Sequence, residues 1–188
     1  MFTRPPAEVP SPLRGLNGPV VGCVGRVWED LDLAPVLAAA QAMPSCTFIF
    51  LGRREDNLMA RRLERLPNIR FVGSCPAVEV PDYLARFDVC INLLRRSERG
   101  GDIIPSRVYE YLASGKPIVS MFWPEQVEHF PDVIYGAHSP EEFARLCRRA
   151  LEEGDGWART RRREHGAAAA WSARAEEVEK ILRAIGLY

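Results

Sequence analysis

The sequence predicts a single α/β domain, with a doubly wound parallel sheet and helices on both of its faces. Short apolar runs alternate with stretches of about 10 to 15 residues that carry apolar side chains at helical spacing. Most of these runs end at or near a glycine, as buried parallel strands do before a turn. At 188 residues the chain is long enough for one hydrophobic core. A ligand of such a sheet lies beyond the carboxyl ends of its strands.

The elements follow one another in a regular order after a lead-in, residues 1–18, that is rich in Pro and Gly. The predicted strands are residues 19–24, 47–51, 69–72, 88–93, 117–121 and 133–135. The predicted helices are residues 31–43, 56–66, 80–87, 107–114 and one that begins after Ser139. Ser139 and Glu142 form a capping box at the start of that helix, with Pro140 at its first position. The turns after the first four strands therefore meet at one edge of the sheet.

The composition changes at the C-terminal end, so we divide the chain into a lead-in (1–18), a Rossmann-like α/β domain (19–155) and a helical segment packed on it (156–188). Residues 167–185 read as one long amphipathic helix. Its core-facing side chains are expected to be Trp171, Ala175, Val178, Leu182 and Ile185. The basic run 159–163 lies among acidic residues, which predicts a solvated face.

Composition excludes several classes of function. Lys plus Arg and Asp plus Glu number 25 each, so no global charge favours nucleic acid. Five widely spaced cysteines indicate reduced, mostly core thiols rather than a disulfide framework or a metal site. Three scattered histidines do not predict a nucleophilic triad. No run approaches the ~20 apolar residues of a membrane span, and we expect a cytoplasmic protein.

Residues 102–118 carry the most specific chemistry. Asp102 and Glu110 flank a Pro-Ser loop that leads into a short helix closed by Gly115. The free N–H groups at the start of that helix suit a diphosphate, and Arg107 adds a charge-assisted hydrogen bond. Glu110 can accept hydrogen bonds from ribose hydroxyls. This arrangement suits a bound nucleotide-sugar.

The stretch Arg107–Val119 resembles the nucleotide-sugar signature of GT-B glycosyltransferases, specifically the C-terminal domain of the large retaining family four. The similarity extends from about residue 19 to 182 and implies one Rossmann-like half of a GT-B enzyme. It implies a hexosyltransferase of polysaccharide biosynthesis that uses a UDP- or GDP-sugar with retention, needs no cofactor and is metal-independent. The residues that it assigns to nucleotide-sugar binding are Gly25, Arg26, Arg53, Cys75, Asp102, Ser106, Arg107, Tyr109 and Glu110.

Some of these positions allow a second interpretation. Asp102 stands where the family has Glu, so a solvated loop carboxylate competes with a sugar contact. Arg107 can also be a surface residue paired with Glu110 or Glu98, and Arg53 a plain surface residue. Tyr109 flanks the diphosphate-binding site in one interpretation and is a core aromatic in the other. No residue is a convincing general base, and we assign none.

GT-B enzymes are about twice as long as this chain, because a second, N-terminal domain handles the acceptor. We therefore expect that domain or a partner subunit to complete the enzyme. The full enzyme is expected to associate peripherally with the inner face of the membrane. We also expect an exposed apolar face where the N-terminal domain would dock, and this face would allow the isolated chain to self-associate. Two alternatives stay open: a non-catalytic nucleotide-binding module of the same fold, and half of a sugar-nucleotide epimerase.

Overall fold

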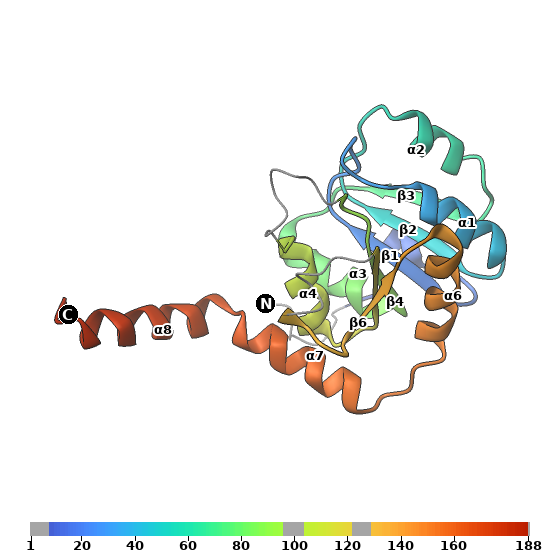
Figure 1. Cartoon of the computed structure of the whole chain (residues 1–188). Coiled ribbons are helices and arrows are strands. Elements are labelled where there is room, and N and C mark those ends of the chain that lie inside the picture. The colour runs from blue at the N-terminus through green and yellow to red at the C-terminus, as the bar shows by residue number, and fades with distance from the viewer. Residues whose placement is uncertain (1–7, 96–103, 122–128, 188) are drawn as a thin grey trace.

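The computed structural model describes residues 8–95, 104–121 and 129–187, and its centre is a six-stranded parallel sheet (Figure 1). The strands lie in the order β3-β2-β1-β4-β5-β6, so the order reverses between β1 and β4. Their bounds are β1 Val20–Val24, β2 Thr47–Leu51, β3 Ile69–Gly73, β4 Val89–Asn92, β5 Ile118–Met121 and β6 Ile134–Ala137. The predicted doubly wound, Rossmann-like fold is confirmed.

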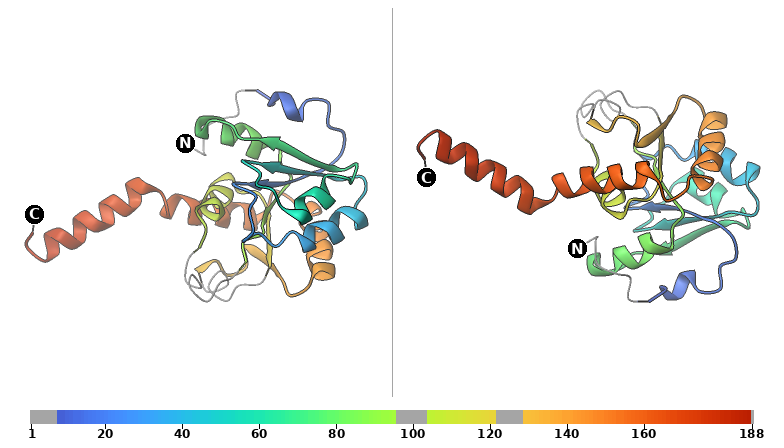
Figure 2. Two further views of the ribbon diagram at one scale, coloured as in Figure 1. Left: turned by 90° about the horizontal axis from the view of Figure 1, so that it is seen from above. Right: turned by 90° about the horizontal axis from the view of Figure 1, so that it is seen from below.

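Helices cover both faces of the sheet (Figures 1 and 2). One face packs against α1 Ala34–Ala42, α2 Leu58–Leu63 and α6 Pro140–Leu151. The other packs against α3 Val80–Arg86 and α4 Ser106–Ser114. Two short 3-10 turns, η1 Ser11–Leu13 and η2 Ala77–Glu79, and the helices α7 Trp157–Ala168 and α8 Trp171–Ala184 complete the described chain. Because both faces are covered, β1 is buried along its whole length and reads as an unbroken apolar run.

Local chemistry explains where the helices begin and end. Ser139 accepts the N–H of Glu142 at 3.1 Å, as the capping box predicts, although the Glu142 carboxylate accepts from His138 rather than from Ser139. Gly115 ends α4 in the left-handed conformation, with φ +76°. The first helix begins at Ala34, three residues later than predicted, because the backbone N–H of Asp32 is held by Leu93 at the end of β4.

The C-terminal segment divides into two helices with different surroundings. The helical conformation is interrupted between α7 and α8, where the backbone of Ala170 is extended. Helix α7 packs against α4, whereas α8 projects from the body and has no buried residue (Figures 1 and 2). The expectation of one long helix with a core-facing stripe is therefore wrong: Trp171 is 86% exposed, and Val178 and Ile185 are also exposed. None of the helices in the described ranges combines the length and apolar character needed to cross a membrane.

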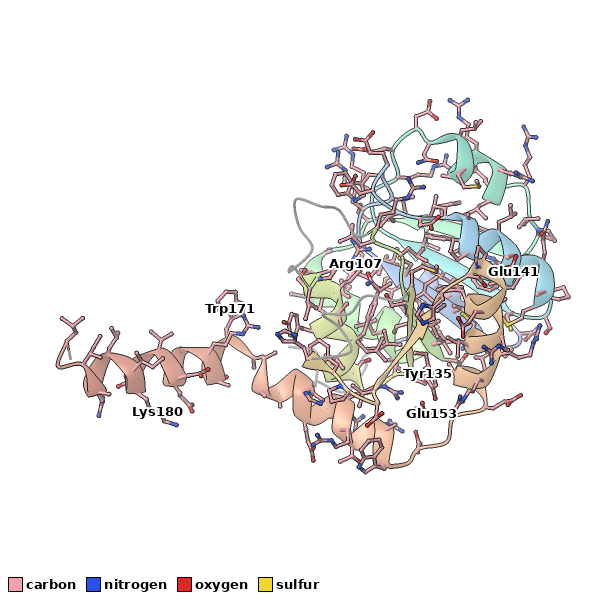
Figure 3. The ribbon with its side chains drawn as sticks, viewed as in Figure 1. Arg107, Tyr135, Glu141, Glu153, Trp171 and Lys180 are labelled. Carbon is pink, nitrogen blue, oxygen red and sulfur yellow. The ribbon has the colours of Figure 1, made fainter. Side chains whose placement is uncertain are left out.

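The basic run 159–163 is not simply a solvated face, because Arg162 is 1% exposed. Its guanidinium donates to the Val133 carbonyl at 2.8 Å and makes two hydrogen bonds with the Glu153 carboxylate. The Tyr135 hydroxyl, from β6, also donates to Glu153, at 2.6 Å, and Figure 3 labels both residues. Burial alone would raise the pKa of Glu153, but these hydrogen bonds and the Arg162 charge lower it. The network fixes α7 to the sheet.

Candidate nucleotide-sugar site

Three glycine turns lie side by side at the carboxyl edge of the sheet. Gly25 and Gly52 follow β1 and β2, and Gly73 is the last residue of β3; all three have positive φ, at +117°, +144° and +75°. The Gly25 N–H donates to Leu51 and the Gly52 N–H donates to Gly73, each at 2.8 Å. A Cβ on Gly52 would lie 2.3 Å from the Gly25 carbonyl oxygen, so only glycine fits there. The predicted convergence of these turns on one edge is confirmed.

Arg107 reaches this edge from the first turn of α4 (Figure 3). Its guanidinium lies against Gly25: a Cβ built there would be 3.0 Å from the Arg107 Cζ. Arg107 Nη1 also donates to the buried Cys23 Sγ at 3.9 Å. These contacts hold a positive charge beside the start of α4, whose Pro105 cap leaves the first N–H groups without a side-chain acceptor. A fixed cation next to a helix N-terminus is an anion-binding arrangement.

Glu110 lies on the same helix as Arg107, three residues further along, and is partly buried. Burial raises the pKa of its carboxyl, and the nearby Arg107 charge offsets part of that rise. Among the residues that the structure describes, none donates a hydrogen bond to this carboxylate. The predicted pairing of Arg107 with Glu110 is therefore electrostatic rather than a direct contact, and Glu98 lies outside the described residues. The Glu110 oxygens can accept hydrogen bonds from a ligand.

The other two predicted arginines are exposed. Arg26 donates to the Glu55 carboxylate and lies over the Trp28 ring, 5.5 Å from its centroid. A diphosphate at Arg26 would therefore compete with Glu55. Arg53 contributes its carbonyl, which accepts the Val27 N–H at 2.8 Å, while its side chain is in solvent.

The remaining predicted residues lie in different surroundings. Ser106 is exposed at the first position of α4, and Cys75 is half-buried after β3. Tyr109 does not flank the predicted diphosphate-binding site: it lies in a hollow of about 520 Å³ between α4, α7 and α8. Its ring meets Phe130 edge-on at 5.7 Å and lies under the Arg174 guanidinium at 5.3 Å. Two residues apart on a helix differ by about 200° in direction, so Tyr109 and Arg107 point to different sides. Asp102 lies outside the described residues.

Two buried residues beside Arg107 escaped sequence reasoning, Cys23 and Tyr111. For Cys23, the sequence predicts only a core thiol. The Tyr111 hydroxyl accepts the Val24 N–H at 2.8 Å, although the two residues are 87 positions apart. The available signal was helical spacing, because position 111 is four residues after Arg107 and therefore on the same face.

The described residues contain no group of three or more His, Cys, Asp or Glu side chains arranged to hold a metal ion. The acidic pair Asp30 and Asp32 has Asp-x-Asp spacing, but Asp32 accepts the Ala34 N–H at 3.2 Å and lies 3.9 Å from Arg95. Asp32 thus serves the start of α1. Metal independence stays a prediction.

The fold is that of a doubly wound α/β domain, and comparison with known proteins narrows the class of protein. The family model described as glycosyl transferase-like matches residues 22–180, so the chain belongs to that family. TuaH of Bacillus subtilis (strain 168), whose name assigns it to teichuronic acid biosynthesis as a glycosyltransferase, is 31% identical over 150 residues. That match covers 76% of this chain and 38% of TuaH.

Solved structures of the same fold are GT-B glycosyltransferases. Sucrose-phosphate synthase from Thermosynechococcus elongatus superposes with a TM-score of 0.72 at 21% identity, over 90% of this chain and 46% of that one. Anabaena HepE, solved with UDP and glucose, gives a TM-score of 0.70 at 17% identity, over 89% of this chain and 49% of that one. The chain thus spans about half the length of these structures and less of TuaH. It is a GT-B glycosyltransferase domain.

Proposed function

We propose that this chain is the donor-binding half of a retaining glycosyltransferase, which transfers a hexose from a UDP-sugar to a polysaccharide acceptor. The proposal rests mainly on one observation: the Arg107 guanidinium lies against Gly25, beside the start of α4 and at the point where the strand order reverses. Ligands of doubly wound sheets bind at that reversal. The acceptor class is supported by the teichuronic acid biosynthesis that the name of TuaH gives.

The choice of donor rests on the structural neighbours and on the carboxyl edge. HepE has been solved with UDP and with UDP-glucose, which supports a uridine nucleotide here. The turn after β3 would hold the base through backbone groups, with Cys75 packed beneath. Arg107 and the N–H groups at the start of α4 would bind the diphosphate. Glu110 would accept hydrogen bonds from the ribose hydroxyls.

In the transfer step, negative charge develops on the diphosphate as the bond to the sugar breaks. A fixed guanidinium and fixed N–H dipoles stabilise that charge without having to reorganise. Arg107 is already held by Gly25 and Cys23, whereas Arg26 would first have to leave Glu55. Glu110 would position the donor rather than take part in bond breaking. The residues that bind the acceptor belong to the other half.

Catalysis is proposed to require that other half, from a longer chain or a partner subunit. The match covers 38% of TuaH and about half of the solved structures. Helix α8 projects from the body and exposes Trp171, which Figure 3 labels. Val178, Ile181 and Ile185 of the same helix are each more than half exposed. Cytoplasmic location, peripheral membrane association and self-association stay predictions.

The test is a titration of the protein with UDP, GDP and ADP, followed by thermal unfolding and calorimetry. A ligand that binds only the folded protein stabilises it, by about 2.7 kcal/mol at 100 times its Kd. We expect a saturable shift with UDP and a weaker one with GDP or ADP. Glu110→Gln should weaken UDP binding, whereas Glu141→Gln, on the exposed first turn of α6, should not.

A pH series with UDP-glucose sharpens this test, because its diphosphate does not titrate near neutral pH. Burial raises the pKa of Glu110, so its charge is present above that pKa and is lost as the pH falls through it. The affinity for UDP-glucose should fall in the same window, and the Glu110→Gln protein should lack this pH dependence. Absence of binding by any nucleotide diphosphate would contradict the donor-binding proposal.

A further inference from the structure

The hydrogen bonding between β1 and β4 stops before the two strands end. Their register pairs Val21 with Val89 and Gly22 with Cys90. One more step would pair Cys23 with Ile91, and the Val24 N–H would then donate directly to the Ile91 carbonyl. No such pair forms between the described strands. The sheet therefore opens at the point where the strand order reverses.

The Tyr111 hydroxyl occupies this missing step of the ladder. It accepts the Val24 N–H at 2.8 Å and donates to the Ile91 carbonyl at 3.4 Å. The two backbone groups that would bond to each other are thus bridged by one hydroxyl from α4. Tyr111 is fully buried, and burial raises the pKa of its phenol well above the ordinary value, so the hydroxyl keeps its proton.

The opened end of β1 is where Arg107 is held. Val24 directly precedes Gly25, the residue on which the Arg107 guanidinium rests, and follows Cys23, whose sulfur accepts from Arg107. Burial raises the pKa of the Cys23 thiol, and Arg107 and Tyr111 offset part of that rise, so both side chains lie near this sulfur. Arg107 and Tyr111 are one turn apart on α4. The same helix therefore opens the strands and places its guanidinium at the opening.

We propose that Tyr111 is a positioning residue for nucleotide binding: its hydroxyl keeps β1 and β4 apart and so fixes Gly25 and the Arg107 guanidinium where the diphosphate binds. This inference rests on the proposed function for the identity of the ligand. Without the hydroxyl, the Val24 N–H either stays buried without an acceptor or bonds directly to Ile91. In both cases the backbone at Gly25 changes, and with it the position of the Arg107 guanidinium.

The experiment compares two single-hydroxyl deletions, Tyr111→Phe and Tyr135→Phe. Tyr135 also uses its hydroxyl in a partly buried hydrogen bond, to Glu153, but lies on β6 away from Arg107 (Figure 3). We expect both variants to melt at a lower temperature than the wild type, because Tyr111→Phe loses two hydrogen bonds and Tyr135→Phe loses one. Only Tyr111→Phe should raise the Kd for UDP, by about tenfold, the effect of misplacing one charged hydrogen bond. Equal Kd values in wild type and Tyr111→Phe would overturn the proposal.

A second measurement needs no nucleotide. The side-chain Nε–H signal of Arg107, assigned by its absence in Arg107→Lys, reports in NMR whether the guanidinium is held. It should be resolved and slow to exchange in the ligand-free wild type and in Tyr135→Phe, and should join the solvent-exposed arginine signals in Tyr111→Phe. An unchanged Arg107 signal in Tyr111→Phe would refute the positioning role. If the wild type binds no UDP, the proposed function fails, and the Arg107 signal still tests whether Tyr111 positions the guanidinium.

Discussion

Replacing Gly25 with alanine is the sharpest perturbation of the site. The new Cβ would lie 3.0 Å from both Cζ and Nη2 of Arg107 and 3.4 Å from Nε. The guanidinium would have to move away from the end of β1. In addition, Gly25 has φ +117°, a conformation that alanine adopts only under strain.

Two effects of different size follow from this geometry. The backbone strain should lower the free energy of unfolding by about 1–3 kcal/mol. Displacing Arg107 removes a charge-assisted hydrogen bond to the diphosphate, a contribution of about 1.5–3 kcal/mol. That loss corresponds to an increase of about 10- to 150-fold in the Kd for UDP. Binding should therefore suffer in a protein that still folds.

Calorimetric titration with UDP and thermal unfolding measure the two effects separately. Gly15→Ala is the matched control: Gly15 also has positive φ, at +72°, but a Cβ added there would meet nothing within 4 Å. The control should lose about 1–2 kcal/mol of stability and bind UDP with the wild-type Kd. A wild-type Kd in Gly25→Ala would show that the seat of Arg107 has no part in binding the diphosphate.

Two further predictions concern how α7 is held. Arg162→Met should lower the free energy of unfolding in urea by about 3–5 kcal/mol, because the Glu153 carboxylate, only 14% exposed, loses the guanidinium that is hydrogen-bonded to it. The folded pKa of Glu153 is lowered, so this contribution is complete above the ordinary pKa of about 4.3 and is lost as the pH falls through the folded value. The difference between wild type and variant should therefore shrink in acid, and a constant difference would argue against the ion pair. Gly166→Ala places a Cβ 2.4 Å from the backbone nitrogen of Ala113, which cannot yield, and should cost about 1–3 kcal/mol in thermal unfolding. Gly154→Ala, in open space, should cost far less, and equal losses would contradict close packing of α7 on α4.

Part of the site could be predicted because its chemistry is local. The order of strands and helices follows from hydrophobic period and length, which each segment carries in itself. Gly25, Gly52 and Gly73 mark strand ends because a chain that turns there needs positive φ. Arg107 and Glu110 were selected by their place in a recognisable helix start, closed by Gly115.

The rest of the site could not be predicted, because its contacts join distant segments. The direction of Tyr109 depends on Phe130 and Arg174, which come from later parts of the chain. Tyr111 and Cys23 read as core residues, since apolar surroundings look the same in sequence whether or not a backbone group needs the hydroxyl. A bond between Val24 and Tyr111 spans 87 residues and leaves no periodic trace.

The two C-terminal helices show the same division. By itself, the sequence determined that the segment is helical and amphipathic, as its spacing of apolar residues requires. Only the tertiary structure decided that Arg162 is buried against Glu153 and that Trp171 and Ile185 of the predicted stripe on α8 are exposed. Periodicity records which side of a helix is apolar. What that side meets is set by long-range packing, and it is packing that placed Arg107 at the opening between β1 and β4.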